Sequence, residues 1–159
     1  MRDFPQVASL PVPPTSRSVC ACSRLRRASR AITQLYDDAL ATSGLRLTQF
    51  GVLRTLSRHE NMTIGALAAQ MLLDRTALSR NVDPLAARGL VRISPGADQR
   101  TRQLALTAAG RQALDAAEPH WAQAQRDVAR RIGKSRLDQL YTLLEDVERL
   151  HPSRASAKA

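Results

Sequence analysis

Aromatic residues are scarce in this sequence and make up 3% of its 159 residues. Proteins that hold single-stranded nucleic acid stack its bases on aromatic side chains, so this scarcity argues against that class. The sequence also has no apolar run of about 20 residues, the length that crosses a bilayer. Because the N-terminus lacks the uninterrupted apolar segment of a secretory signal, we expect a cytoplasmic protein that enters no membrane.

Residue clusters that carry chemistry are missing as well. The sequence contains no glycine-rich phosphate loop and no grouping of histidine and cysteine at zinc spacing. Asp37 and Asp38 are adjacent in a predicted helix, so their carboxylates point about 100° apart and make a poor catalytic pair. The sequence therefore predicts no enzyme, and it implies no cofactor and no bound metal.

Acidic residues are few compared with basic ones. The chain has 14 Asp and Glu against 24 Lys and Arg, which gives a formal net charge of +10. An excess of this size favours a polyanionic partner, because binding releases the counterions condensed on its phosphates. A nucleic acid and an anionic membrane surface both remain open on charge alone.

The stretch Met62–Leu106 predicts a compact helical motif. Apolar residues in Ile64–Met71 recur at helical spacing, and Thr63 precedes them as a helix cap. Asp74 is placed to cap a second helix, in which Leu78, Val82 and Leu85 are predicted to face inward by their spacing. Gly89 ends this helix in the left-handed conformation that glycine tolerates.

A hairpin is predicted directly after these two helices. Leu90–Ser94 and Arg102–Leu106 alternate in polarity like strands, and Pro95–Arg100 between them is rich in turn residues. Two short helices followed by a basic hairpin make a winged helix-turn-helix, which is a unit that binds double-stranded DNA.

This order of elements resembles the MarR family of dimeric transcriptional regulators. The segment LDRTALSRNVDPLAARGLV matches the recognition segment of that family, and the more specific match is Asp98-Gln99-Arg100 followed by Leu106-Thr107 and Gly110. The resemblance covers roughly Ser23 to Leu150. Pro84 departs from the pattern, and we expect it to bend the second helix or loosen its last turn.

The predicted recognition helix presents a polar stripe suited to base edges. Arginine offers guanine two donors and asparagine can pair with adenine, while other contacts reach only phosphate. The resemblance implies that Arg100 enters a minor groove, that Asp98 orients its guanidinium, and that Gln99 and Arg102 are secondary candidates. The stripe on the helix consists of Arg75, Thr76, Ser79, Arg80 and Asn81.

Apolar seams of heptad type mark longer helices on both sides of the winged unit. We expect the segments 23–58 and 108–150 to form a helical dimerisation platform, and 59–107 to form the DNA-binding unit. A monomer that buries all the seams internally is the alternative, but DNA sites with twofold symmetry favour the dimer. Pro119 is predicted to kink or break the helix that contains it. The predicted helix caps are Ser23, Thr48, Thr107 and Ser135.

The two ends of the chain are predicted to be irregular. Residues 1–22 contain four prolines and form either a loose leader or an arm that packs across a partner subunit. Residues 151–159 are predicted to be a disordered tail.

An effector is implied by the resemblance, because MarR-like proteins often bind small aromatic acids or phenols beside the dimer platform. Tyr36, Phe50, Arg54 and His59 are the candidates for such a cleft, and ordinary core and surface roles are the alternative.

Cys20 and Cys22 offer a second way to sense a signal. A helix N-terminus and nearby arginines favour the thiolate, which is the reactive form. If the segment is extended, both side chains point the same way and can approach one soft ion. The alternative is two incidental thiols in a mobile arm.

The sequence thus predicts a mainly α protein with a small β-hairpin wing, which acts as a homodimeric, sequence-specific DNA-binding regulator. A small ligand or thiol modification would release it from a pseudo-palindromic operator. Two alternatives are a nonspecific architectural DNA-binding protein and a winged-helix module that binds protein.

Overall fold

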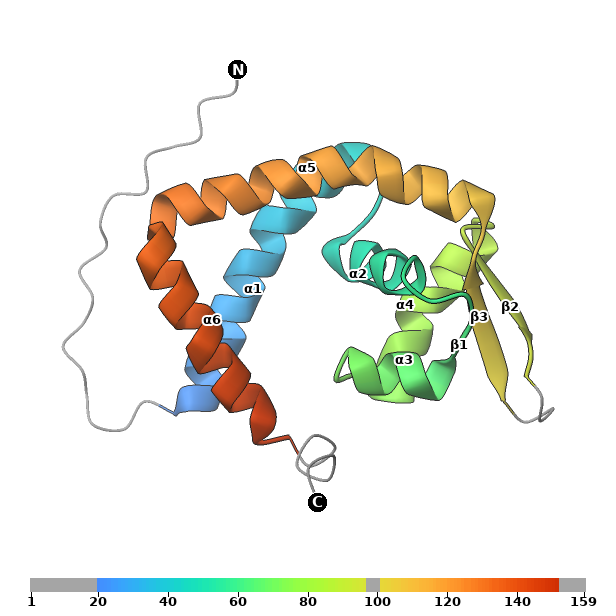
Figure 1. Ribbon diagram of the computed structural model, residues 1–159, viewed down its shortest axis with the longest axis horizontal. Helices are drawn as coiled ribbons and strands as arrows, with labels where there is room; N and C mark the ends of the chain where they lie inside the picture. The colour runs from blue at the N-terminus through green and yellow to red at the C-terminus, as the bar shows by residue number, and fades with distance from the viewer. Residues whose placement is uncertain (1–19, 97–100, 152–159) are drawn as a thin grey trace.

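A long helix, α5 (Ala108–Ile132), joins the two parts of the molecule. The computed structural model describes residues 20–96 and 101–151. Figure 1 shows α5 as an arch, with the winged helix-turn-helix at its beginning and two further helices, α1 (Ala21–Leu40) and α6 (Lys134–Arg149), towards its other end. This mainly α architecture with a small antiparallel sheet is the one that the sequence predicts.

The winged unit contains the two short helices expected from the sequence. They are α3 (Ile64–Gln70) and α4 (Arg75–Ala87). Among the described residues, the strands form a three-stranded antiparallel sheet in the order β1-β3-β2. The hairpin strands are β2 (Val91–Pro95), one residue later than predicted, and β3 (Arg102–Leu106). The short strand β1 (Met62–Thr63) was not predicted, because two residues are too few to show an alternating pattern.

The main apolar cluster holds the winged unit together. It includes the side chains predicted to face inward from α4, and Leu78, Val82 and Leu85 are almost fully buried there. The helix α2 (Leu47–Leu56) packs into the same cluster through Phe50, Val52, Leu53 and Leu56.

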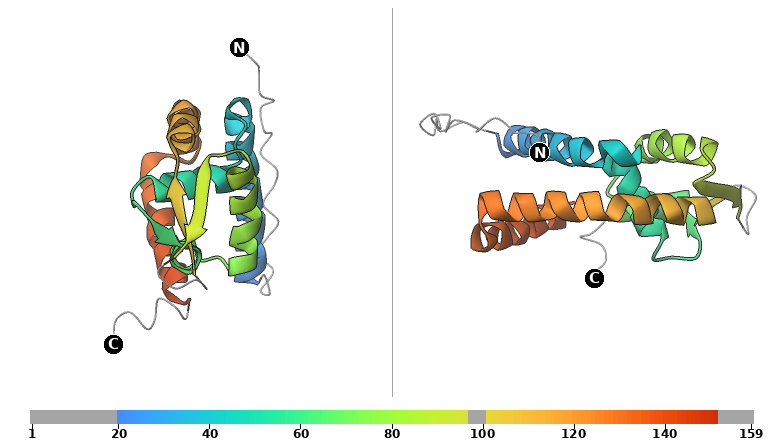
Figure 2. Two further views of the ribbon diagram at one scale, coloured as in Figure 1. Left: turned by 90° about the vertical axis from the view of Figure 1, so that its right-hand side faces the viewer. Right: turned by 90° about the horizontal axis from the view of Figure 1, so that it is seen from above.

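A smaller apolar cluster joins α1, α5 and α6. It consists of Tyr36, Ala124, Val128 and Leu137, which are all buried. Beyond this cluster α1 and α6 lie on opposite sides of the molecule, as both views in Figure 2 show. The outer part of α6 is therefore uncovered, and its exposed large apolar residues are Leu140, Tyr141, Leu143, Val147 and Leu150.

Three predicted helix caps are confirmed by their hydrogen bonds. The Thr63 hydroxyl accepts from the backbone N–H of Ala66 at 3.1 Å, and the Asp74 carboxylate accepts from Ala77 at 2.8 Å. The Thr107 hydroxyl accepts from the N–H of Gly110 at 2.9 Å. These bonds satisfy N–H groups that the first turn of a helix leaves free.

Two other predicted caps, Ser23 and Ser135, are wrong because each lies inside the helix that it was expected to precede. The N-cap of α1 is Cys20, so the helix begins at Ala21, inside the segment 1–22 that was predicted to be irregular. The predicted boundary after residue 22 is therefore wrong. The helix α6 begins at Lys134, directly after Gly133, whose φ of 87° ends α5.

Thr48 is also wrong as a cap, because α2 begins one residue earlier at Leu47. The Asp37 carboxylate of α1 accepts from the N–H of Leu47 at 2.6 Å. A residue ten positions upstream therefore supplies the acceptor, and a local capping pattern cannot show it.

The prolines in α4 and α5 do not end these helices. The break predicted at Pro119 is wrong, because α5 continues to Ile132 and buried residues on both sides of the proline anchor it. The helix α4 continues past Pro84 to Ala87, and the N–H of Arg88 donates to the Pro84 carbonyl at 3.2 Å. One missing backbone bond thus costs less than the packing that holds each helix.

Several predicted features lie outside the described residues. They are most of the N-terminal arm, the centre of the wing turn with Asp98, Gln99 and Arg100, and the tail beyond His151. Within the described part of the chain, no helix is long and apolar enough to span a membrane.

Candidate nucleic-acid interface

The outer face of α4 carries the polar side chains predicted to contact DNA. Arg75, Thr76 and Arg80 are exposed, while Ser79 is half-buried. The apolar face of the helix is fixed in the main cluster, so this polar face is held rigidly towards solvent.

Asn81 is less available than the sequence suggested. It is half-buried, and its side-chain amide donates to the backbone carbonyl of Ala77 at 2.9 Å. Pairing with adenine would require this bond to break or the side chain to turn.

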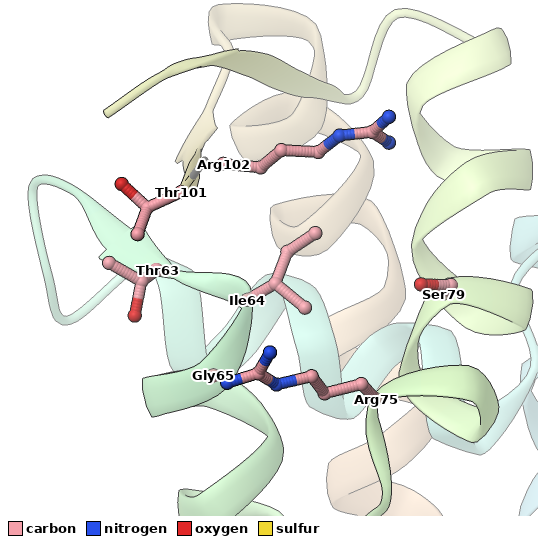
Figure 3. A pocket seen from close by; sticks show the side chains of 7 residues that line it. All are labelled: Thr63, Ile64, Gly65, Arg75, Ser79, Thr101 and Arg102. Carbon is pink, nitrogen blue, oxygen red and sulfur yellow. The ribbon is translucent and has the colours of Figure 1, made fainter. Parts of the chain in front are cut away.

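A groove of about 310 Å³ separates α4 from the wing. Figure 3 shows the Arg75 guanidinium beside Gly65, while Arg102 extends from β3 towards α4. The structure thus brings two predicted DNA-contact residues to one groove, although 27 positions separate them in the sequence. The lining residues are Thr63, Ile64, Gly65, Arg75, Ser79, Thr101 and Arg102.

The strand register explains the direction of Arg102. Side chains two residues apart share one face of a strand, so Arg102 lies on the same face as the buried Leu104. That face turns towards α3 and α4. Two positive charges flanking one groove with hydroxyl groups on its walls make a site suited to a phosphate of the DNA backbone.

Arg92 is a candidate that the sequence analysis missed. It is exposed on β2 and pairs with Ala105, which places it on the face of the hairpin opposite to Arg102. The sequence offered one signal for this residue, because Arg92 lies between the apolar Val91 and Ile93 in an alternating strand pattern and is therefore expected on the outer face.

The two cysteines occupy the first turn of α1. Both are free and exposed, with Cys20 as the N-cap and Cys22 inside the helix. Because Cys22 is helical, the segment is not extended through both cysteines, and the shared direction that an extended segment would give their side chains is not expected. No grouping of three or more potential metal ligands occurs in the described ranges.

Cys20 nevertheless has an activating environment. The backbone N–H of Ser23 lowers the pKa of its thiol, and the backbone N–H of Cys22 and the Ser23 hydroxyl act in the same direction. These donors stabilise the thiolate, as a helix N-terminus does for an anion.

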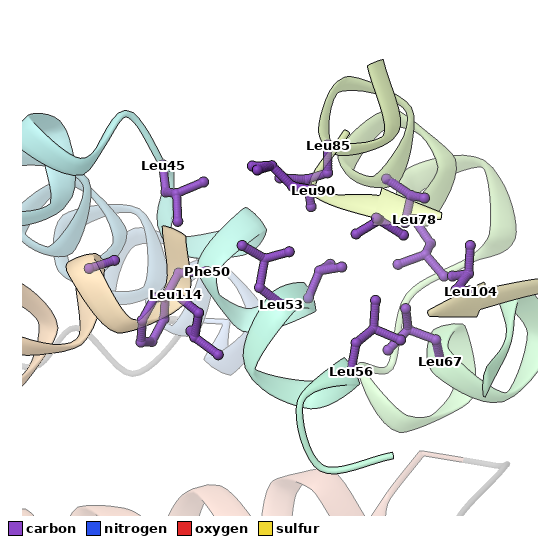
Figure 4. Packing of buried hydrophobic residues seen from close by; sticks show 14 of the residues in the cluster. Leu45, Phe50, Leu53, Leu56, Leu67, Leu78, Leu85, Leu90, Leu104 and Leu114 are labelled. Atoms are coloured by element: carbon purple, nitrogen blue, oxygen red, sulfur yellow. The ribbon is translucent and has the colours of Figure 1, made fainter. Parts of the chain in front are cut away.

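Of the four predicted cleft residues, Phe50 and Arg54 lie together, with the Arg54 guanidinium carbon 5.9 Å from the Phe50 ring centroid. Phe50 is 1% exposed among the packed side chains of the main cluster (Figure 4), so it offers a ligand almost no surface in this conformation. The Tyr36 hydroxyl donates to Gln125 at 2.5 Å, and burial raises its pKa, with a smaller contribution from Tyr141. His59 is exposed beyond the end of α2.

Trp121 is the aromatic residue that the prediction missed in this region. Its ring stacks on Phe50 with centroids 5.7 Å apart, and the Arg54 guanidinium carbon lies 3.9 Å from a Trp121 ring centroid. Glu118 forms an ion pair with Arg54 at 3.8 Å. Arg54 and Trp121 are half-buried, so they supply the accessible part of this cluster.

Two hydrogen bonds tie the junction after α1 to other elements. Arg88, the C-cap of α4, donates to the Gly44 carbonyl at 2.9 Å. The Thr42 hydroxyl and the His120 ring of α5 are 3.3 Å apart. The helix α4 is thus linked directly to the segment where α1 ends.

Comparison with known proteins agrees with these features. The MarR family model matches residues 43–101. The Mycobacterium tuberculosis transcriptional regulator MosR, solved with DNA, is 39% identical; the match covers 82% of this chain and 97% of that one, with a TM-score of 0.71. CouR from Rhodococcus jostii RHA1, solved with p-coumaroyl-CoA, is 25% identical over 83% of this chain and 95% of its own, with a TM-score of 0.69.

A more distant structure shows the same fold. A mutant of MarR from Escherichia coli, in a complex with operator DNA, is 21% identical over 79% of this chain and 91% of its own, with a TM-score of 0.72. Among curated protein sequences, none matches this chain.

Proposed function

Because this chain belongs to the MarR family of transcriptional regulators, we propose that it is a homodimer that binds a pseudo-palindromic operator in double-stranded DNA. The observation that carries the proposal is the groove between α4 and the wing, with Arg75 and Arg102 beside it. We propose repression as its action, since a dimer across an operator excludes other proteins from the same DNA.

The side chains around this groove divide into two roles. Arg75 and Arg102 contact the DNA backbone, because both side chains line the groove between α4 and the wing. Thr76 and Arg80 are exposed on the outer face of α4 and read base edges in the major groove. On the family resemblance alone, we also propose that Arg100 enters the neighbouring minor groove and that Asp98 orients its guanidinium.

Dimerisation is supported by the uncovered parts of α1 and α6. Leu143 of α6 is 62% exposed, the C-cap Leu150 is 80% exposed, and α1 leaves Ile32 at the surface. A second copy that covers these residues would remove apolar area from water, which is the main force in such association. Twofold symmetry then places the recognition helices about 34 Å apart, as successive major grooves require.

Release from DNA is proposed to begin at α1. Modification of Cys20 or Cys22 would add bulk at the first turn of this helix. The other end of α1 is fastened to α2 by Asp37, and the next turn is tied to α4 through Gly44 and Arg88. A shift of α1 would therefore change the spacing of the recognition helices and weaken DNA binding.

A small ligand is the second route to release. The exposed side of the Arg54 and Trp121 cluster joins an aromatic ring to a cationic group, which suits an aromatic acid. The relative CouR was solved with the aromatic thioester p-coumaroyl-CoA, which supports a search among such ligands.

The proposal is tested by a gel-shift assay on the DNA upstream of the protein's own gene. We expect a discrete complex that survives excess unrelated DNA and dissociates when peroxide, a thiol-reactive electrophile or an aromatic acid is added. A complex that unrelated DNA removes equally well would support an architectural DNA-binding protein instead. Complete absence of DNA binding would favour the protein-interaction module.

A further inference from the structure

The first half of α1 carries positive charge that the proposed operator contacts do not use. Four arginines lie between positions 24 and 30, and all of them are exposed. The helix contains no lysine and has no acidic residue before Asp37. Within the described part of the chain, none of the four arginines forms an ion pair. They are Arg24, Arg26, Arg27 and Arg30.

Helical spacing places three of these arginines on one side of α1. Ile32 lies in the middle of the apolar side of the helix, which continues to the buried Tyr36. Measured around the helix at about 100° per residue, the three arginines lie at least about 120° away from Ile32. We call this side the arginine face, and it consists of Arg26, Arg27 and Arg30 with the polar Ser23 and Gln34 between them.

Among the described residues, no carboxylate neutralises the arginine face. The nearest acidic residues along the helix, Asp37 and Asp38, lie about two turns beyond Arg30. Asp37 pairs with Arg46 at 3.6 Å, and Asp38 accepts a hydrogen bond from Gln34 at 2.8 Å. The arginine face is therefore available to an anionic partner from outside the chain.

The arginine face lies away from the proposed operator contacts. Figure 1 shows the first half of α1, in blue, and the β2–β3 hairpin towards opposite ends of the longest axis of the molecule. Because the arginine face is opposite to the apolar side of α1, a second copy that covers the apolar side leaves the arginines exposed. Operator binding and dimerisation are thus both compatible with a further partner at this face.

The chemistry of the arginine face favours a nucleic-acid backbone as that partner. Protein interfaces have an apolar core, but this face has no apolar residue to supply one. A helix that lies on a membrane buries its apolar side in the lipid, whereas the apolar side of α1 points away from the arginines. A guanidinium pairs well with phosphate, and each phosphate that it neutralises releases counterions.

We propose that the arginine face binds the phosphate backbone of a second DNA duplex, so that one homodimer bridges its operator and another DNA segment. This inference rests on the proposed operator binding and adds a contact at the other part of the molecule. Twofold symmetry gives the dimer two arginine faces. Contacts to phosphate carry no sequence information, so the second duplex needs no particular sequence.

Co-capture of two duplexes tests the proposal. The duplex upstream of the protein's own gene would be immobilised, loaded with full-length protein and washed, and a fluorescent duplex of unrelated sequence would then be added at about 50 mM salt. The unaltered protein should retain the second duplex. The variant R26Q/R27Q/R30Q should retain at least about tenfold less of it, because three phosphate contacts of each subunit are lost.

The variant R126Q/R130Q/R149Q is the matched control, because it removes the same number of positive charges from α5 and α6. These three arginines are exposed, and each is bonded to a residue on its own helix. The control should retain the second duplex like the unaltered protein. Fluorescence anisotropy should give both variants the same affinity for the upstream duplex.

Equal co-capture by the two variants would overturn the proposal, as would an unaltered protein that binds the upstream duplex but retains no second one. Sedimentation with phosphatidylserine vesicles that requires the arginine face, without co-capture of DNA, would replace DNA by a membrane surface as the partner. An unaltered protein that does not bind the upstream duplex would instead contradict the proposed function.

Discussion

The carbonyl oxygen of Leu90 occupies the space that a side chain at Gly110 would need. Leu90 follows the end of α4, and Gly110 lies in the first turn of α5. Thr107 strengthens the contact, because its hydroxyl donates to the carbonyls of Gly89 at 2.7 Å and Leu90 at 3.1 Å. The close approach therefore fixes the direction in which α5 leaves the winged unit.

Replacing Gly110 by alanine should lower the free energy of unfolding by about 1–3 kcal/mol, because the obstructing atom is backbone and cannot turn away. The better helix propensity of alanine offsets at most about 1 kcal/mol. Urea denaturation followed by circular dichroism measures the change.

Gly51→Ala is the matched control for this substitution. Its added Cβ would lie 3.5 Å from the Met71 methyl carbon, which is ordinary contact inside α2. We expect this variant to be as stable as the unaltered protein or slightly more stable. If Gly110→Ala behaved in the same way, the close approach of Leu90 would not constrain α5.

Asp37 should stabilise the protein through the N-terminus of α2. Its carboxylate accepts from the N–H of Leu47, so Asp37→Ala leaves that donor without this partner and should cost about 0.5–2 kcal/mol. Asp37→Asn keeps an acceptor oxygen, so its free energy of unfolding should fall by less than that of Asp37→Ala. Equal losses in thermal denaturation for the two variants would argue that the hydrogen bond contributes nothing.

Salt dependence of DNA affinity should distinguish the phosphate-contacting residues of the proposed interface from the base-reading ones. Arg75→Ala and Arg102→Ala should each weaken binding to all DNA sequences. Each should reduce the slope of log affinity against log salt by about 0.9 for each half-site, which is about 1.8 for the dimer. Arg80→Ala should cost about 1–3 kcal/mol on the operator and relax its sequence preference. Fluorescence anisotropy across a salt series measures both, with the remote Arg149→Ala as control.

An unchanged salt slope in both groove variants would mean that the groove holds no phosphate. A loss of affinity for Arg80→Ala that was equal on operator and scrambled DNA would mean that Arg80 contacts only the backbone.

The Cys20 thiol should be more reactive at neutral pH than the thiol of an unstructured cysteine. The backbone donors of the first turn lower its pKa, so a larger thiolate fraction is present at neutral pH. The Cys22→Ser variant, which retains Cys20, should then react with iodoacetamide at a rate that levels off at a lower pH than an unstructured thiol does. A pH profile that coincides with that of a thiol in the urea-unfolded protein would contradict this role of the helix N-terminus.

Local patterns in the sequence sufficed for most of the fold. Thr63 and Asp74 were predicted as caps from their type and position, and each accepts from the N–H three residues further on. Leu78, Val82 and Leu85 were predicted to face inward from their spacing, and all three are buried. Such features depend on nearest neighbours along the chain, which is the range over which helix periodicity and capping act.

Contacts between distant residues set the limits of that prediction. Thr48 was wrong as a cap because Asp37 on another helix supplies the acceptor, and the break at Pro119 failed because packing outweighs one lost bond. In the candidate site, local pattern predicted the exposed polar face of α4. The position of Arg102 in the same groove as Arg75 depends on how the wing folds back, and no spacing along the chain encodes that position.

Sequence-selective binding of the homodimer to DNA is the central claim, and one measurement tests it most directly. Affinity would be measured for the upstream operator and for a scrambled duplex of the same length and composition, across a series of salt concentrations. We expect the affinity for both duplexes to fall steeply with salt, by about 0.9 log units per log unit of salt for each phosphate contacted. The operator should be bound at least about 10³-fold more tightly than the scrambled duplex throughout. Equal affinity for the two duplexes at every salt concentration would contradict the account.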